Sequence, residues 1–194
     1  MKLLAPSPGW TARADVIVVG SGIAGLTTAL QCRTYGLSVL LVTKASVDEG
    51  STKWAQGGIA AALGDGDSPE AHEQDTLVAG AGLCDVDAVR VLVTEGPEAV
   101  RKLIERGAIF DTEASGEISL TREGGHLRNR ILHAGGDSTG NDIMSALRTE
   151  LQNRENITVH QQTMALELKE LKTRSSFLKN AVSLTFQHPF TFLI

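Results

Sequence analysis

The residues best suited to chemistry lie close together in the segment TREGGHLRNRILHAGGDSTG, residues 121–140. The segment contains two glycine pairs among its ionisable side chains. Six of these side chains lie within residues 122–133: Arg122, Glu123, His126, Arg128, Arg130 and His133. One interpretation is a polar surface loop whose charges pair with one another. The other is an anion-binding loop that carries one acid or base, Glu123. An uncharged substrate would not need this much positive charge.

A glycine-rich turn earlier in the chain predicts a nucleotide cofactor. Residues 16–19 form a short apolar run, typical of a strand buried on both faces, and residues 38–43 form a second one. Between them stand a helical pattern and the motif G-x-G-x-x-G, made by Gly20, Gly22 and Gly25. This order of elements favours a dinucleotide, with its pyrophosphate at the helix N-terminus, over a purely structural turn.

The second predicted strand ends without the acidic residue that usually holds the adenosine ribose. Thr43 and Lys44 stand there instead, which weakens a simple NAD interpretation. Lys44 either neutralises cofactor phosphate or is an ordinary solvated lysine at the end of a strand. The next segment, STKWAQGGIAAAL at 51–63, reads on its own only as a loop that enters a helix.

Helices are expected on either side of this chemistry. Ser68 as N-cap, with proline next to it, predicts a helix over about 69–80, on which His72 is expected to face solvent without a role. Residues 86–107 predict a pair of helices, with Pro97 opening the second member and a glycine ending it.

Strands are expected around the reactive segment and after it. Residues 108–122 predict short strands or a hairpin, and a helix follows over 138–153, capped by Asp137 or Ser138. Residues 156–168 predict two short strands, of which one rejoins the sheet beside the first strand.

Composition limits the classes of protein that fit. At 194 residues the chain is long enough for one domain with a core, and its net charge of −5 argues against a nucleic acid partner. Cys32 and Cys84 are too far apart to suggest a zinc site or a disulfide framework, which fits a reducing cytoplasm. No metal site, signal peptide or membrane span is expected.

The last part of the chain differs in composition from the rest. All 20 glycines lie between Gly9 and Gly140, while four of the five phenylalanines lie between Phe177 and Phe192. The final 24 residues contain no Asp or Glu. We interpret this as a change near residue 170 from a folded domain to a tail of unrelated composition. The alternative is an ordinary C-terminal pair of strands.

Four stretches of the chain together resemble the front portion of the L-aspartate oxidase family. They are VIVVGSGIAGL, EGSTKWAQGGIAAAL, DTLVAGAGLCDVDAV and LTREGGHLRNRILHAGGDSTG, and the likeness runs in unbroken order from about residue 14 to 168. Members are flavoproteins that oxidise L-aspartate to iminoaspartate on the bacterial route to quinolinate and NAD. The resemblance implies a cytoplasmic enzyme that takes L-aspartate, passes electrons to oxygen or fumarate, and has quinolinate synthase as a partner enzyme.

The fold that the resemblance implies is α/β, a Rossmann-like FAD-binding domain with a parallel sheet flanked by helices, here incomplete. The expected divisions are an N-terminal extension at 1–13, the partial FAD-binding domain at 14–169 and the divergent tail at 170–194. The tail is expected to come from a frameshift, an early stop or a divergent splice. The capping domain and the principal proton-transfer arginine of the family lie beyond the matched region.

The resemblance also implies which residues contact FAD. The pyrophosphate would lie at Gly20, Ser21, Gly22, Ile23, Ala24 and Gly25, and the adenosine half at Lys44, Ala165 and Leu166. The flavin would lie along Ser51, Thr52, Ala55, Gln56, Gly57 and Gly58. Succinate dehydrogenase and fumarate reductase flavoproteins carry a histidine in place of Ser51 that bonds covalently to FAD, so dissociable FAD is expected here.

The implied catalytic residues are Glu123, His126 and Arg130. Glu123 matches a family carboxylate proposed to position the substrate ammonium, and His126 and Arg130 would help to shape the pocket. Two alternatives stay open beside an L-aspartate oxidase. One is a fumarate reductase or succinate dehydrogenase type flavoprotein, and the other is an FAD-binding fragment without turnover.

Overall fold

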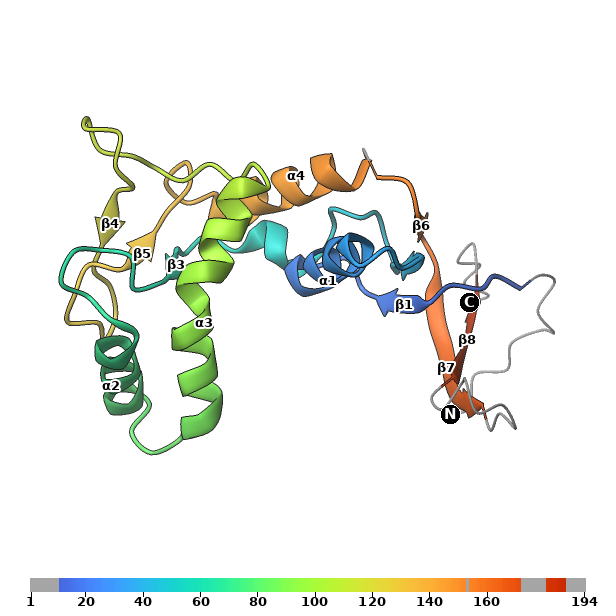
Figure 1. Cartoon of the computed structure of the whole chain (residues 1–194), viewed down its shortest axis with the longest axis horizontal. Helices are drawn as coiled ribbons and strands as arrows, with labels where there is room; N and C mark the ends of the chain where they lie inside the picture. The colour runs from blue at the N-terminus through green and yellow to red at the C-terminus, as the bar shows by residue number, and fades with distance from the viewer. Residues whose placement is uncertain (1–10, 153, 172–180, 188–194) are drawn as a thin grey trace, which may run out of the picture. The chain divides into compact units, whose positions relative to one another are not determined.

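The computed structural model describes residues 11–152, 154–171 and 181–187. The chain divides into two compact units (Figure 1). The first unit joins Met1–Gly50 to Leu151–Ile194, and the second unit is Ser51–Glu150. Most of the expected N-terminal extension, residues 1–10, lies outside the described residues.

The first unit contains a parallel sheet built around the glycine-rich turn. Its elements are β1 (Val16–Val19), α1 (Ile23–Thr34), β2 (Val39–Val42) and β6 (Ile157–His160). The strands pair in the order β1-β2-β6, and all four residues of β2 are buried. Helix α1 adds three buried side chains, Leu26, Ala29 and Leu30. Burying a leucine of this kind contributes about 1.5–3 kcal/mol, so the apolar run that predicted β2 also forms the core.

These observations confirm the predicted α/β class and the strand, turn, helix and strand expected from residues 16–43. The returning strand was placed wrongly. It pairs with β2, with Val39 opposite Ile157, and not beside β1. Apolar residues in a strand favour its burial, but they do not specify which strand of the sheet it pairs with.

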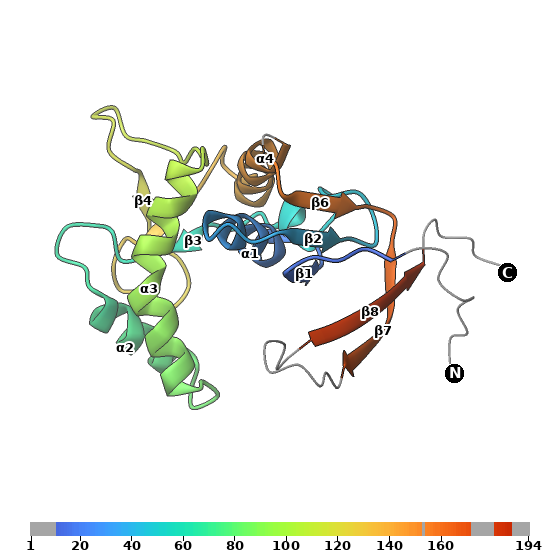
Figure 2. The same cartoon turned by 45° about the vertical axis from the view of Figure 1, so that its right-hand side comes forward.

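A pair of antiparallel strands follows the sheet in the first unit. Strand β7 (Met164–Leu171) pairs with β8 (Ala181–Gln187) (Figure 2). In this register Met164 stands opposite Gln187. A C-terminal pair of strands was the alternative that the sequence analysis left open for this region. Strand β7 also crosses residue 169, where the FAD-binding domain was expected to end. The rest of the expected tail, 172–180 and 188–194, lies outside the described residues, so the division at 170 stays a prediction.

The second unit combines a small antiparallel sheet with three α-helices. Its helices are η1 (Ser51–Trp54, a 3-10 turn), α2 (Pro69–Ala79), α3 (Val86–Glu105) and α4 (Thr139–Gln152). Its strands are β3 (Ile59–Ala60), β4 (Leu120–Thr121) and β5 (Ile131–Leu132), paired in the order β3-β5-β4. Helices α2 and α3 lie side by side (Figure 1).

The helix starts follow the predicted capping residues. The Ser68 hydroxyl accepts a hydrogen bond of 3.2 Å from the Ala71 N–H at the start of α2, as expected for an N-cap. Ser138 immediately precedes α4, and its hydroxyl donates to the Asp142 carboxylate at 2.7 Å. The expected hairpin at 108–122 is also present, with Thr112 opposite Ile118 ahead of β4.

Two expectations for the second unit were wrong. Residues 86–105 form one continuous helix, because Pro97 shares a buried face with Val93, Val100 and Leu103, and this packing carries the helix across the missing proline N–H. The stretch after Gly58 forms strand β3 and not a helix, because its backbone pairs with β5.

Candidate functional site

The glycine-rich turn of the first unit has the geometry that a bound phosphate requires. Gly20 has a φ of +103°, which a residue with a side chain rarely adopts. A Cβ on Gly25 would overlap the Gly20 carbonyl oxygen, so α1 can approach the turn this closely only with glycine there. The N-cap of α1 is Gly22, which offers no side chain to the first turn, and that turn contains no acidic residue to repel an anion.

The other predicted residues of the first unit surround this turn. Ser21 is buried, and its hydroxyl shares a 2.8 Å hydrogen bond with that of Thr43, which ties the turn to the end of β2. Lys44 follows as an exposed residue. Ala165 and Leu166 lie half-buried on β7. The residues present in this unit therefore fit a dinucleotide at the turn, while the contacts of the last three stay predictions.

The predicted flavin segment of the second unit is held by backbone contacts. Ser51, Ala55, Gln56 and Gly57 are exposed, and Thr52 and Gly58 are half-buried. The Gly140 N–H at the start of α4 donates to the Ala55 carbonyl at 3.0 Å. A Cβ on Gly58 would overlap Ile131 and Leu132 of β5. The segment is thus fixed on two sides and leaves four residues open to a cofactor.

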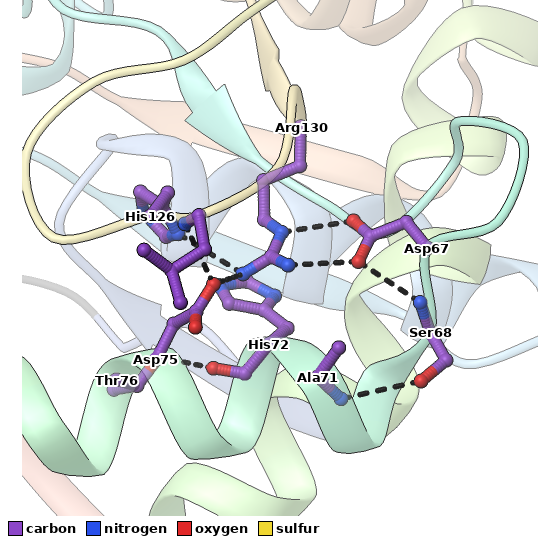
Figure 3. Close-up of polar contacts among 9 residues, drawn as sticks. Asp67, Ser68, Ala71, His72, Asp75, Thr76, His126 and Arg130 are labelled. Carbon is purple, nitrogen blue, oxygen red and sulfur yellow. Dashed lines mark hydrogen bonds and ion pairs between the residues drawn. The ribbon is translucent and has the colours of Figure 1, made fainter.

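Arg130 lies at the centre of a buried ion-pair cluster (Figure 3). Its side chain is fully buried, and its Nε and Nη2 donate to the two oxygens of Asp67 at 2.8 and 2.7 Å. Its Nη1 donates to Asp75 at 2.8 Å and to Nδ1 of His126 at 3.2 Å. All three nitrogens are engaged, so Arg130 holds the loop 122–130 against α2 and does not present a free guanidinium.

The contact with Arg130 also fixes the tautomer of His126. An arginine side chain only donates hydrogen bonds, so Nδ1 of His126 accepts and its Nε2 carries the hydrogen. The arrangement therefore brings two of the three predicted catalytic residues, His126 and Arg130, together. Their predicted part in shaping a substrate pocket is compatible with this contact and stays a prediction.

The carboxylates of this cluster are held in the charged form. The backbone N–H of Leu127, 2.9 Å away, lowers the pKa of Asp75, and Arg130 adds to this effect against the cost of burial. Burial alone would raise the pKa of Asp67, but the hydrogen bonds from Arg130 and the Ser68 N–H outweigh it and lower that pKa. Burial opposes the charge of Arg130 as well, yet the two aspartates raise its pKa.

His72 belongs to the same cluster, and its expected place on a solvated face was wrong. It is 3% exposed, and its ring centroid lies 5.2 Å from that of His126. Among the residues that the structure describes, its Nδ1 is the buried side-chain polar atom that has no hydrogen-bond partner. Burial lowers the pKa of His72, and the nearby Arg130 and His126 lower it further, so the imidazole is neutral.

Glu123, the third predicted catalytic residue, belongs to a different contact. Its Oε1 lies 2.8 Å from Nε2 of His133, which is also 3.2 Å from the Thr121 hydroxyl. The Glu123 side chain is 53% exposed and that of His133 is 18% exposed. The structure therefore places an accessible carboxylate, steadied at one oxygen, on the rim of the loop that Arg130 anchors.

Comparison with known proteins identifies the fold family. The model of a family described as "FAD binding domain" matches residues 15–182. The chain belongs to this family. Its cofactor is FAD, in agreement with the glycine-rich turn of the first unit.

The FAD-binding domain is similar in sequence to several L-aspartate oxidases. It is 66% identical over 147 residues to the enzyme of Streptomyces coelicolor and 50% identical over 143 residues to that of Mycobacterium tuberculosis, which corresponds to 76% and 73% of this chain. The chloroplastic enzyme of Oryza sativa is 49% identical over 79% of the chain. The chain spans about a quarter of the length of these relatives, 25%, 27% and 24% respectively.

Solved structures with the same fold are more distant in sequence. The Mycobacterium smegmatis Sdh1 complex in the apo form matches with a TM-score of 0.75 and 34% identity, over 81% of this chain and 29% of that chain. The E. coli quinol fumarate reductase FrdA with the E245Q mutation matches with a TM-score of 0.77 and 28% identity, over 82% and 27%. These matches confirm the predicted flavoprotein superfamily and fold.

Several residues of the FAD-binding domain escaped the sequence analysis. Asp67 and Asp75 pair with a residue 55 to 63 positions away, and no local pattern indicates such a partner. The spacing of His72 and Asp75 on one helix face was the available signal, since two polar residues three positions apart can share a buried polar site.

Among the described residues, no helix is long and apolar enough to cross a membrane.

Proposed function

We propose that the protein carrying this sequence is an L-aspartate oxidase, which converts L-aspartate to iminoaspartate by hydride transfer to FAD. The observation that carries the proposal is the 66% identity to the Streptomyces coelicolor L-aspartate oxidase. The solved Sdh1 and fumarate reductase structures reach only 34% and 28% over a similar share of the chain. The product would enter NAD biosynthesis through quinolinate, with quinolinate synthase as the partner enzyme, in the cytoplasm.

Bound FAD would accept the hydride, and this chain would provide binding and orientation. The glycine turn from Gly20 to Gly25 would hold the pyrophosphate, with Lys44, Ala165 and Leu166 on the adenosine side. The segment from Ser51 to Gly58, in which Ser51, Ala55, Gln56 and Gly57 are exposed, would lie along the flavin. Succinate dehydrogenase and fumarate reductase flavoproteins attach FAD through a histidine at the position of Ser51. Because serine lacks an imidazole, the flavin would be dissociable in this protein.

Substrate recognition would rest on charge. Glu123 is an accessible carboxylate of the reactive segment, and it would meet the substrate ammonium. Arg130, through its two buried ion pairs, would keep the loop 122–130 in place while His126 lines the pocket. Orientation of this kind lowers the barrier because the reacting carbon is held ready for transfer.

A fumarate reductase or succinate dehydrogenase type flavoprotein is the second candidate, favoured by the solved structures of that kind that share the fold. Anaerobic mixing of the FAD-loaded protein with L-aspartate or with succinate separates the candidates. Loss of the flavin absorbance with L-aspartate supports the proposal, and loss with succinate alone supports the second candidate. FAD binding without reduction by either would indicate an FAD-binding fragment without turnover. Oxygen or fumarate added afterwards identifies the electron acceptor.

A further inference from the structure

His133 lies between the predicted flavin segment and the predicted substrate carboxylate. It directly follows β5, the central strand of the small sheet, which pairs with β3 on one side and β4 on the other. In the β3–β5 register Ile59 stands opposite Leu132, so Gly58 comes next to His133. A Cβ on Gly58 would lie 3.1 Å from Cε1 of the imidazole. The ring therefore packs against the backbone of Gly58.

The other end of the imidazole ring contacts Glu123. Nε2 is 2.8 Å from the Glu123 carboxylate and 3.2 Å from the Thr121 hydroxyl, which lies across the β4–β5 ladder. Because an ionised carboxylate only accepts hydrogen bonds, Nε2 donates in the contact with Glu123. A carboxylate offers several lone pairs, so a donor at Oε1 leaves capacity for a second donor such as an ammonium group.

We propose that His133 is a specificity-determining positioning residue. It spans from Gly58 to Glu123 and holds this carboxylate at a fixed place relative to the flavin segment. There the carboxylate meets the ammonium group of an amino dicarboxylate. The inference rests on the proposed function and deepens it, because it assigns the choice of an amine-bearing substrate to the pair His133 and Glu123.

The inference separates two kinds of ligand. L-aspartate and succinate share two carboxylates, but only L-aspartate has an ammonium group for Glu123 to meet. Loss of the His133 contact should therefore weaken the binding of L-aspartate and leave that of succinate unchanged. A residue that merely supports the fold would affect both ligands alike.

The test compares His133→Phe, which keeps a ring against Gly58 but donates no hydrogen bond, with His133→Gln, which retains a side-chain N–H. In FAD-loaded protein, L-aspartate and succinate are titrated separately and binding is followed by the change in flavin absorbance. We expect the His133→Phe variant to bind L-aspartate about tenfold or more weakly, with succinate affinity within about twofold of wild type. The His133→Gln variant should recover most of the affinity for L-aspartate. With L-aspartate as substrate, KM should rise more than kcat falls.

A second measurement needs neither FAD nor turnover. The ¹⁵N chemical shift of Nε2 of His133 is compared between wild type, Glu123→Gln and Glu117→Gln, the last being the same change at an exposed hairpin residue. The shift should change in the Glu123→Gln protein and stay constant in the Glu117→Gln protein.

The outcomes distinguish this inference from the proposed function. A wild-type protein that neither binds nor oxidises L-aspartate overturns the proposed function, and the inference with it. If wild type does bind L-aspartate, equal losses of both ligands in the His133→Phe protein, or no loss, overturn the inference alone. An unchanged Nε2 shift in the Glu123→Gln protein overturns it as well.

Discussion

Replacing Arg130 with methionine tests whether the buried cluster holds the second unit together. The change removes a fully buried charge and leaves the carboxylates of Asp67 and Asp75, which are 2% and 7% exposed, without their partner. Removing one partner from a buried ion pair typically costs about 3–5 kcal/mol. With an m-value of about 2 kcal/mol/M in urea, the midpoint of unfolding should fall by roughly 1.5–2.5 M.

The second unit supplies a matched control at Arg90. This arginine also pairs with two carboxylates, Glu73 and Asp87, each at 3.2 Å, but its side chain is 56% exposed. An exposed pair contributes about 0–1 kcal/mol, so Arg90→Met should lower the urea midpoint by less than about 0.5 M. Equal effects of Arg90→Met and Arg130→Met would refute the reasoning.

Acid provides an independent check on the same cluster. The folded state lowers the pKa of Asp67 and of Asp75, so their contribution to stability is present above about pH 4 and is lost as pH falls through their folded values. The difference in unfolding free energy between wild type and Arg130→Met should therefore shrink below about pH 4. A triple variant that combines Arg130→Met with Asp67→Asn and Asp75→Asn should recover part of the lost unfolding free energy at neutral pH, because no buried charge is left unpaired.

Three further predictions concern His72, the glycine turn and the flavin linkage. The pKa of His72 is lowered in the folded state, so its neutral form contributes stability above about pH 6.5 that is lost as pH falls. Between neutral pH and pH 5.5, the unfolding free energy of His72→Leu should therefore rise by up to about 1.4 kcal/mol relative to that of wild type. If urea unfolding gives parallel pH profiles for the two proteins, this prediction is wrong. Gly25→Ala should weaken FAD binding about tenfold or more in a fluorescence titration, because the added Cβ overlaps Gly20, whereas Gly96→Ala has open space and should leave it unchanged. Acid precipitation should release the flavin into the supernatant, and flavin retained in the pellet would show that Ser51 does not prevent covalent attachment.

The sequence predicts those parts of the fold whose causes are local. The turn from Gly20 to Gly25 and the start of α2 at Ser68 each follow from the backbone freedom or hydrogen bonding of a few neighbouring residues. Pro97 misled the prediction because its effect on a helix depends on packing: buried neighbours three or four positions away keep α3 continuous.

The candidate site was harder to predict because its contacts are distant in the sequence. Arg130, His126 and Glu123 were identified by residue type, but their partners come from α2, from the loop before it and from the residue that follows β5. Polar residues are spread along α2, so its apolar periodicity does not mark the face of His72 as buried, and the three-residue spacing from Asp75 was the local signal. Only the pairing of β3, β5 and β4 brings Gly58, His133 and Glu123 to one place.

An FAD titration of the purified protein, followed by flavin fluorescence, tests the central claim most directly. The account predicts saturable binding of one FAD per chain, because the chain belongs to the FAD-binding family and the turn at Gly20 and Gly25 has the backbone geometry that a bound phosphate requires. Linear change without saturation, in protein that shows a cooperative unfolding transition, would contradict it.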